Sequence, residues 1–115
     1  MRVTSDFWVA ALIRRVFSAG GFAAVMHRGS TEAGAIMILS RDRFGSVRLY
    51  RPAAQTSYDT AKPDERLFSD AGAMTEEAIE ARLEKERRFD PDIWIVELEL
   101  SGQTIDELIT LDASE

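Results

Sequence analysis

The first 20 residues show the apolar spacing of a helix. The apolar positions that recur every three or four residues are Val9, Leu12, Ile13, Val16 and Phe17. Ser5 is suited to cap the start of this helix, and Gly20-Gly21 is suited to end it, because glycine accepts a left-handed backbone. Most of the helix circumference is apolar, so we expect it to be largely buried or to offer a second face to a partner.

Three apolar segments separated by short polar turns predict three strands. They cover residues 22–28, 35–40 and 47–51. The segment 35–40 carries apolar side chains at both odd and even positions. It therefore predicts a central strand that is covered on both faces, or one that is covered once and flanked by a partner. The turns contain glycine and are short, which favours antiparallel neighbours.

The second half of the chain predicts a loop, a helix and a strand. Residues 52–65 are polar and show no hydrophobic periodicity, which predicts a loop. Leu67-Phe68 is long enough for only a brief fourth strand. Thr75 is suited to cap a second, surface helix that stops before Pro91. Residues 94–100 alternate apolar and acidic side chains, as a half-buried strand does. The tail at 104–111 has the spacing of a short amphipathic turn or helix.

These segments together predict an α+β fold. We expect two layers, with a mostly antiparallel sheet of four to five strands and the two main helices on one face. The length of 115 residues predicts a single domain over residues 1–115. Within it we expect a core of about residues 3–100 and a C-terminal tail of 101–115.

The composition excludes several classes of function. The chain has no cysteine, so disulfides, thiolate catalysis and thiolate metal sites are ruled out. The longest clean apolar run, residues 7–13, is far shorter than the ~20 residues that a membrane-spanning helix needs. No segment has the form of a signal peptide. We therefore expect a cytoplasmic protein that does not engage a membrane.

The net charge of -6 is unevenly distributed. Residues 1–51 hold eight arginines and three acidic residues, whereas residues 52–115 hold six basic and 17 acidic residues. Such a division predicts either a bipolar surface with a basic half for an acidic partner, or two halves that neutralise each other. The overall acidity argues against general nucleic-acid binding.

Several short sequences resemble one known family. They are the Phe7-Trp8-Val9 and Arg14-Arg15 pieces of the first helix, the turn Glu32-Ala33-Gly34-Ala35, the strand end Leu49-Tyr50-Arg51-Pro52-Ala53, and the corner Arg88-Phe89-Asp90-Pro91-Asp92-Ile93-Trp94. The chain resembles, over roughly residues 2–100, a family of small alphaproteobacterial proteins known only as domain of unknown function 1491. The resemblance implies a bacterial cytosolic source. It implies no activity and no site residues.

Neither the histidine nor the paired aspartates form a motif of known chemistry. His27 is the single histidine, and it has no second histidine or cysteine to complete a metal site. Asp90 and Asp92 flank Pro91 and could act as an acid–base pair or bind a hard cation. The same residues make good turn chemistry between a helix and a strand, which we favour. We expect no metal, no cofactor and no catalytic residue.

The arginines are the stronger lead toward a ligand. Arg48 and Tyr50 are two residues apart on one strand and so share a face, and Arg28 lies at the end of another. An Arg–Tyr face could hold a phosphate or stack a base, which suggests nucleotide or RNA contact. We favour the alternative that the arginines on or beside the three strands pair with the acidic helix at 76–86. These are Arg28, Arg41, Arg43, Arg48 and Arg51.

The sequence indicates a binding module rather than an enzyme. We expect a non-enzymatic interaction domain that assembles as a homo-oligomer or binds a protein partner. The alternative is a small ligand-binding or enzymatic domain around the 52–65 loop. Its candidate residues are Arg51, Tyr58, Arg88, Asp90 and Asp92.

Overall fold

The computed structural model describes residues 3–53 and 66–112. Within these ranges the chain forms two α-helices, six strands and one short 3-10 helix. The elements in chain order are α1 (Ser5–Ser18), β1 (Phe22–His27), β2 (Ile36–Arg41), β3 (Val47–Pro52), β4 (Leu67–Met74), α2 (Glu76–Phe89), β5 (Trp94–Glu99), η2 (Ile105–Glu107) and β6 (Thr110–Leu111). None of the helices in the described part of the chain has the length and apolar content to cross a membrane.

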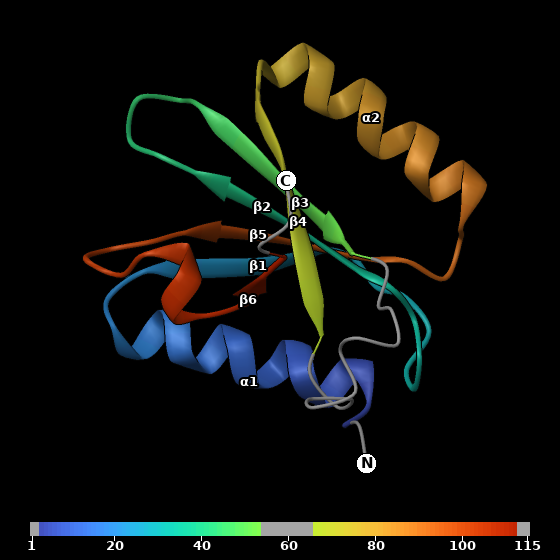
Figure 1. Cartoon of the computed structure of the whole chain (residues 1–115), viewed down its shortest axis with the longest axis horizontal. Coiled ribbons are helices and arrows are strands. Elements are labelled where there is room, and N and C mark those ends of the chain that lie inside the picture. The colour runs from blue at the N-terminus through green and yellow to red at the C-terminus, as the bar shows by residue number, and fades with distance from the viewer. Residues whose placement is uncertain (1–2, 54–65, 113–115) are drawn as a thin grey trace.

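The six strands form one mixed sheet in the order β1-β5-β2-β3-β4-β6 (Figure 1). The pairs β1–β5, β2–β3 and β3–β4 are antiparallel. The pairs β2–β5 and β4–β6 are parallel. The prediction of an α+β fold is therefore confirmed, but the expected four to five mostly antiparallel strands are corrected to six strands in a mixed sheet.

The last long strand, β5, lies between β1 and β2, which we had expected to be neighbours. Both of its faces are apolar at its start, because Trp94 and Val96 point to one side and Ile93 and Ile95 to the other, and all four are buried. A strand that is apolar on both faces belongs in the middle of a sheet. The acidic Glu97 and Glu99 at its far end had suggested a half-buried strand instead.

The two helices lie on opposite faces of the sheet, so the molecule has three layers rather than the expected two (Figure 1). Helix α1 buries Val9, Leu12 and Val16 in one core with the side chains of β2 and β5 that point toward it. Helix α2 buries Ile79 and Leu83 in a second core on the other face. The double coverage explains why β2 is apolar on both faces, as predicted for a central strand.

Helix α1 begins one residue earlier than predicted. Thr4 occupies the N-cap position, and Ser5 is the first helical residue. The buried Ser5 hydroxyl donates a hydrogen bond of 2.6 Å to the Gly34 carbonyl. This bond fastens the start of the helix to the loop between β1 and β2.

Helix α2 begins and ends as the sequence indicates. The Thr75 side chain accepts a hydrogen bond of 3.1 Å from the Ala78 amide. Glu76 and Glu77 lie in the first turn, and Arg87 and Arg88 lie in the last, which suits the helix dipole. The helix ends at Phe89, before Pro91.

Strand β4 is longer than expected, and the tail adds a short strand to the short amphipathic helix that was predicted there. Strand β4 has eight residues instead of a brief Leu67-Phe68 segment, because small and polar residues continue the pairing with β3 through a register shift near Gly72. Gly72 has a φ of 95°, which few other residues adopt. The tail forms η2 and β6, and it buries Leu108 and Ile109 against α1's core, so the core extends beyond residue 100.

Candidate functional site

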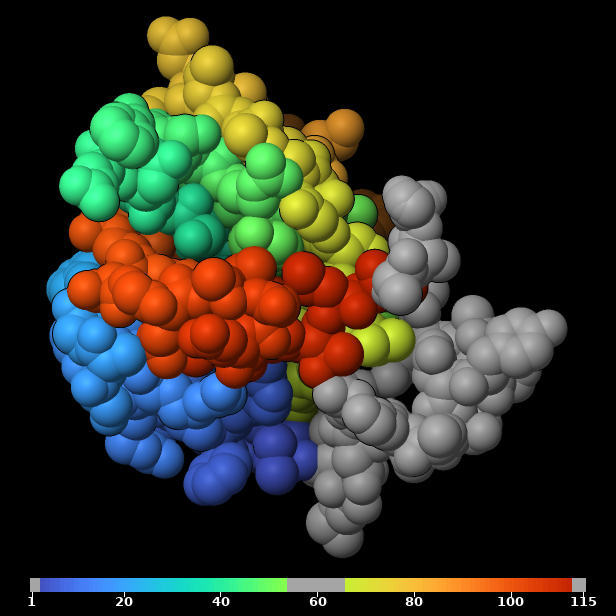
Figure 2. Space-filling model, turned by 60° about the vertical axis from the view of Figure 1, so that its left-hand side comes forward, coloured from blue at the N-terminus to red at the C-terminus, as the bar shows by residue number. Residues whose placement is uncertain are grey.

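Arg48 and Tyr50 line a hollow between the β2–β3 hairpin and the segment that follows β5. Its volume is about 430 Å³, and we call it the β2–β3 hollow. Figure 2 shows the hairpin in green directly above that segment in orange. The polar and aromatic residues of its lining include Arg43, Phe44, Arg48, Tyr50 and Gln103. The prediction that Arg48 and Tyr50 share a face is consistent with this placement.

A two-oxygen ion pair orients Arg48. Its Nη1 atom donates to both carboxylate oxygens of Asp70 on β4, at 3.0 and 2.9 Å. The hydrogen bond and charge of Asp70 raise the pKa of Arg48 further. Burial raises the pKa of the neighbouring Tyr50, the Asp70 charge adds to that rise, and the Arg48 charge opposes it. Tyr50 therefore stays neutral at physiological pH.

Because the pKa of Tyr50 is raised in the folded protein, part of the free energy of unfolding is lost at alkaline pH. An unfolded tyrosine loses its proton near pH 10, whereas folded Tyr50 retains it to higher pH. The stabilisation is complete below pH ~10 and is lost as the pH rises through the folded pKa. We expect Tyr50→Phe to flatten the fall in unfolding free energy above pH ~10, measured by urea unfolding at several pH values. Identical curves for both proteins would contradict the shift.

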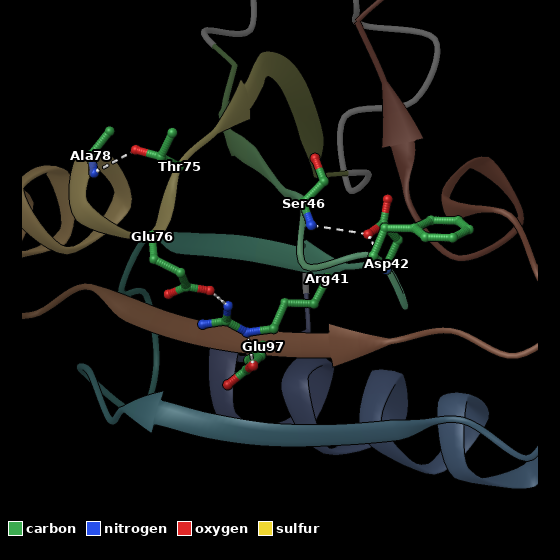
Figure 3. A network of polar contacts seen from close by, with 8 residues as sticks. Arg41, Asp42, Ser46, Thr75, Glu76, Ala78 and Glu97 are labelled. Atoms are coloured by element: carbon green, nitrogen blue, oxygen red, sulfur yellow. Dashed lines mark hydrogen bonds and ion pairs between the residues drawn. The ribbon is translucent and has the colours of Figure 1, made fainter.

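Arg41 joins three elements on the other side of the sheet (Figure 3). Its guanidinium donates to Glu97 on β5 and pairs with Glu76 at the start of α2. Arg51 pairs with Glu86 of α2 at 3.3 Å. The favoured interpretation, that arginines of the sheet pair with the acidic helix, is confirmed for Arg41 and Arg51. Arg48 instead pairs within the sheet.

Arg51 and Arg88 share a second depression, of about 350 Å³, on the α2 face. Lys85, Glu86 and Phe89 complete its lining, and Phe89 is 88% exposed. Of the five candidate residues of the predicted ligand site, this depression brings together Arg51 and Arg88.

The other three candidates lie elsewhere or cannot be placed. Asp90 and Asp92 form the turn between α2 and β5: the Asp92 amide donates to the Asp90 carboxylate at 3.1 Å, and the Ile93 amide donates to the Asp90 carbonyl at 3.2 Å. Turn chemistry is thus their observed role. Tyr58 lies outside the described residues. No group of three or more metal-binding side chains occurs within residues 3–53 and 66–112.

Arg28 does not join Arg48 and Tyr50. Its guanidinium lies 5.0 Å from the centre of the Trp94 ring. Trp94 is opposite Ile36 at the start of β2, whereas Arg48 is opposite Ser40, four residues further along. Four residues of strand span roughly 13 Å. His27, beside Arg28, makes a 2.7 Å hydrogen bond through Nδ1 to the Ile93 carbonyl, which is a structural role.

An exposed apolar surface lies at the β1 end of the sheet. Strand β1 is paired only with β5 among the described strands. Its Phe22, Val25 and Met26 side chains and Phe17 of α1 are between 39% and 50% exposed. The Phe17 and Phe22 rings meet edge to face at 5.7 Å. We call these four residues the β1 edge.

The exposed apolar surface lies on β1 and not on β2. Of the two alternatives for residues 35–40, the central strand covered on both faces is confirmed, because Ile36, Met37, Ile38 and Leu39 of β2 are all buried within the chain. The signal for the β1 edge was present in residues 22–27, which contain no charged residue and no proline. Native edge strands usually carry such residues as protection against pairing.

Comparisons with known proteins identify relatives of known structure. The model of the family described as "Protein of unknown function (DUF1491)" matches residues 3–105. A solution structure of a protein from A. tumefaciens is 46% identical, with 100% of this chain and 98% of that chain covered and a TM-score of 0.82. A crystal structure of a DUF1491 family protein from Caulobacter crescentus CB15 is 33% identical, with 96% and 99% covered and a TM-score of 0.78. No curated protein matches the chain.

Proposed function

Because the chain belongs to the DUF1491 family, whose description assigns no activity, we propose from its surface that it is an interaction module that self-associates through the β1 edge. The partner is a second copy of the same chain. The observation that carries the proposal is that β1 lies at the end of the sheet, paired on one side only among the described strands. Its exposed apolar side chains lie next to an exposed aromatic residue of α1.

The backbone of β1 favours a strand as the occupant. A strand at the end of a sheet presents a row of backbone N–H and C=O groups that point away from its neighbour. Only another extended segment offers donors and acceptors at the same repeat. The pairing of β1 with β5 is regular from Phe22 to Val25, and the register shifts between Val25 and His27. The regular part is therefore the segment available for pairing.

The side chains favour a second copy over an unrelated peptide. An antiparallel pair of β1 strands related by a two-fold axis brings the same apolar surface of both copies together. Strand β1 carries no formal charge at neutral pH, so this pairing places no like charges opposite each other. The contact between the Phe17 and Phe22 rings extends the surface from the strand to α1, where the second copy offers an equal surface.

The available area fits a weak dimer. Each half-exposed aromatic ring offers roughly 100 Å² of surface, given the ~200 Å² that a whole aromatic side chain buries. With the aliphatic side chains and the strand backbone, two copies would bury on the order of 1,000 Å², the lower limit for a specific interface. Each copy carries a net charge of -6. Added salt should therefore strengthen the dimer by screening the repulsion.

We expect light scattering after size-exclusion chromatography to give a mass above that of the 12.9 kDa chain, rising toward twice that value with protein concentration. Val25→Lys should shift the protein to the monomer and weaken association at least tenfold, because it places a charge in the middle of the apolar contact. The far-ultraviolet circular dichroism spectrum should be unchanged, since Val25 is already 39% exposed.

The matched control is Phe89→Lys, which adds the same charge at an exposed apolar position on α2, away from the β1 edge. This variant should associate as the parent chain does. A monomer at all concentrations for the parent chain, or an equal loss of association in both variants, would contradict the proposal. Binding of an unrelated extended peptide to β1 in the absence of self-association would replace the second copy as the partner.

A further inference from the structure

One buried polar atom of the β2–β3 hollow has no hydrogen-bond partner in the described part of the chain. The Gln103 Oε1 atom is buried and accepts no hydrogen bond from residues 3–53 or 66–112. Tyr50, which is 4% exposed, lines the same hollow. Buried polar groups are nearly always hydrogen bonded, so the unpaired Gln103 oxygen at this hollow points to a bound group that donates to it.

Two arginines of the same hollow, Arg43 and Arg48, have guanidinium N–H groups that are available to a ligand. Arg48 uses Nη1 alone for both bonds to Asp70, which leaves its Nη2 and Nε groups free to donate. Arg43 has no carboxylate partner within the described residues, and its guanidinium lies 5.8 Å from the centre of the Phe44 ring. Planar guanidinium groups with free donors bind phosphate oxygens well.

An aromatic ring stands at the rim of the hollow. Phe44 lies at the tip of the β2–β3 hairpin and is 86% exposed. The Asp42 carboxylate accepts hydrogen bonds of 2.9 Å from the amides of both Phe44 and Ser46, which fixes the turn that presents the ring. An exposed and positioned ring of this kind is a stacking surface for a flat, aromatic ligand.

We propose that the β2–β3 hollow binds a nucleoside monophosphate. The base stacks on Phe44, the phosphate lies on Arg43 and Arg48, and Gln103 accepts a hydrogen bond from a base N–H group. The volume of about 430 Å³ is within the ~300–1,000 Å³ range of small-ligand sites. A single nucleotide suits the molecule better than a nucleic-acid chain, because the net charge of -6 repels a long polyanion.

The proposal is tested by titrating the ¹⁵N-labelled chain with each of the four common nucleoside 5′-monophosphates, with inorganic phosphate alone as the comparison. We expect at least one nucleotide to move the amide resonances of Phe44 and Ser46 and the side-chain amide resonances of Gln103. Its affinity should exceed that of inorganic phosphate at least tenfold and should fall as salt is added.

Single variants separate the three contacts. Phe44→Ala should weaken nucleotide binding about tenfold by removing the stacking surface, and Arg43→Ala should weaken it similarly and reduce the salt dependence. Gln103→Leu should weaken the nucleotide but leave inorganic phosphate unchanged. The matched controls are Phe89→Ala and Arg87→Ala, which alter an exposed ring and an exposed guanidinium on α2.

Three results would overturn the proposal. The first is the absence of resonance shifts at the hollow with all four nucleotides at millimolar concentration. The second is equal affinity for inorganic phosphate and for the nucleotides, which would leave the base without a role. The third is unchanged nucleotide binding by both Phe44→Ala and Arg43→Ala.

Discussion

Replacing Trp94 with alanine is expected to lower the free energy of unfolding by about 3–5 kcal/mol, the range measured for large aromatic residues in protein cores. Trp94 is 1% exposed and is the largest of the fully buried side chains. Its indole Nε1 donates a 2.7 Å hydrogen bond to the Ser30 carbonyl, and its ring lies beneath the Arg28 guanidinium. The alanine variant would lose the packing, the hydrogen bond and the cation–π contact together.

Urea unfolding followed by circular dichroism measures this effect, and Trp94→Phe serves as the graded comparison. Phenylalanine retains most of the packing but cannot donate to the Ser30 carbonyl, so its cost should be smaller than that of alanine. Phe89→Ala is the control, because Phe89 is almost fully exposed. A loss below about 1 kcal/mol for Trp94→Ala would show that the β5 position carries far less of the core than its burial indicates.

Replacing Gly29 with alanine is expected to cost about 3 kcal/mol or more, although it adds a single methyl group. A Cβ atom at Gly29 would meet the Asp92 carbonyl oxygen, and it would lie 2.7 Å from the Ile93 carbonyl carbon and 2.8 Å from its oxygen. These are backbone atoms at the entrance to β5, so they cannot rotate away as a side chain can. The loop or the strand would have to shift.

The displaced loop also carries the 2.9 Å bond from the Ser30 amide to the Asp92 carbonyl. We therefore expect the thermal midpoint of Gly29→Ala to fall by more than about 10 °C. Glu32→Ala is the matched control, because Glu32 lies in the same loop with an exposed side chain, and its midpoint should change by only about 1–2 °C. Equal midpoints for Gly29→Ala and the parent chain would mean that the loop is not held against β5.

Local elements of this fold follow from the sequence because their signals are local. The Thr75 cap, the stop before Pro91 and the short glycine-bearing turn between β2 and β3 each depend on residues within a few positions. The position of β5 between β1 and β2 depends instead on contacts between residues about 60 apart in the sequence, such as the bond between Ser30 and Asp92. No spacing within either segment indicates that pairing.

The number of layers was missed for a related reason. Ile79 and Leu83 give α2 only a narrow apolar stripe, and nothing in that stripe says which face of the sheet it covers. The two apolar faces of β2 held the relevant information, since a strand that is apolar on both sides needs cover on both sides. Combining those two signals would have predicted that the two helices cover opposite faces of the sheet.

The candidate residues divide in the same way. The shared face of Arg48 and Tyr50 followed from strand alternation, whereas Asp70, the ion-pair partner of Arg48, lies on a strand that the sequence barely indicates. Gln103 joins them across the hollow from the segment after β5, and no local spacing could have associated it with β3. Tertiary structure also separates Arg28 from this group.

Amide hydrogen exchange of β1 is the measurement that tests self-association through the β1 edge most directly. The relevant amides are those of residues 22–25 that do not bond to β5. We expect their protection to increase as the protein concentration is raised from about 10 μM to about 1 mM, a range suited to a small interface. The amides of β2, buried in the centre of the sheet, should not change. Protection of the β1 amides that is independent of concentration would contradict dimerisation through this edge.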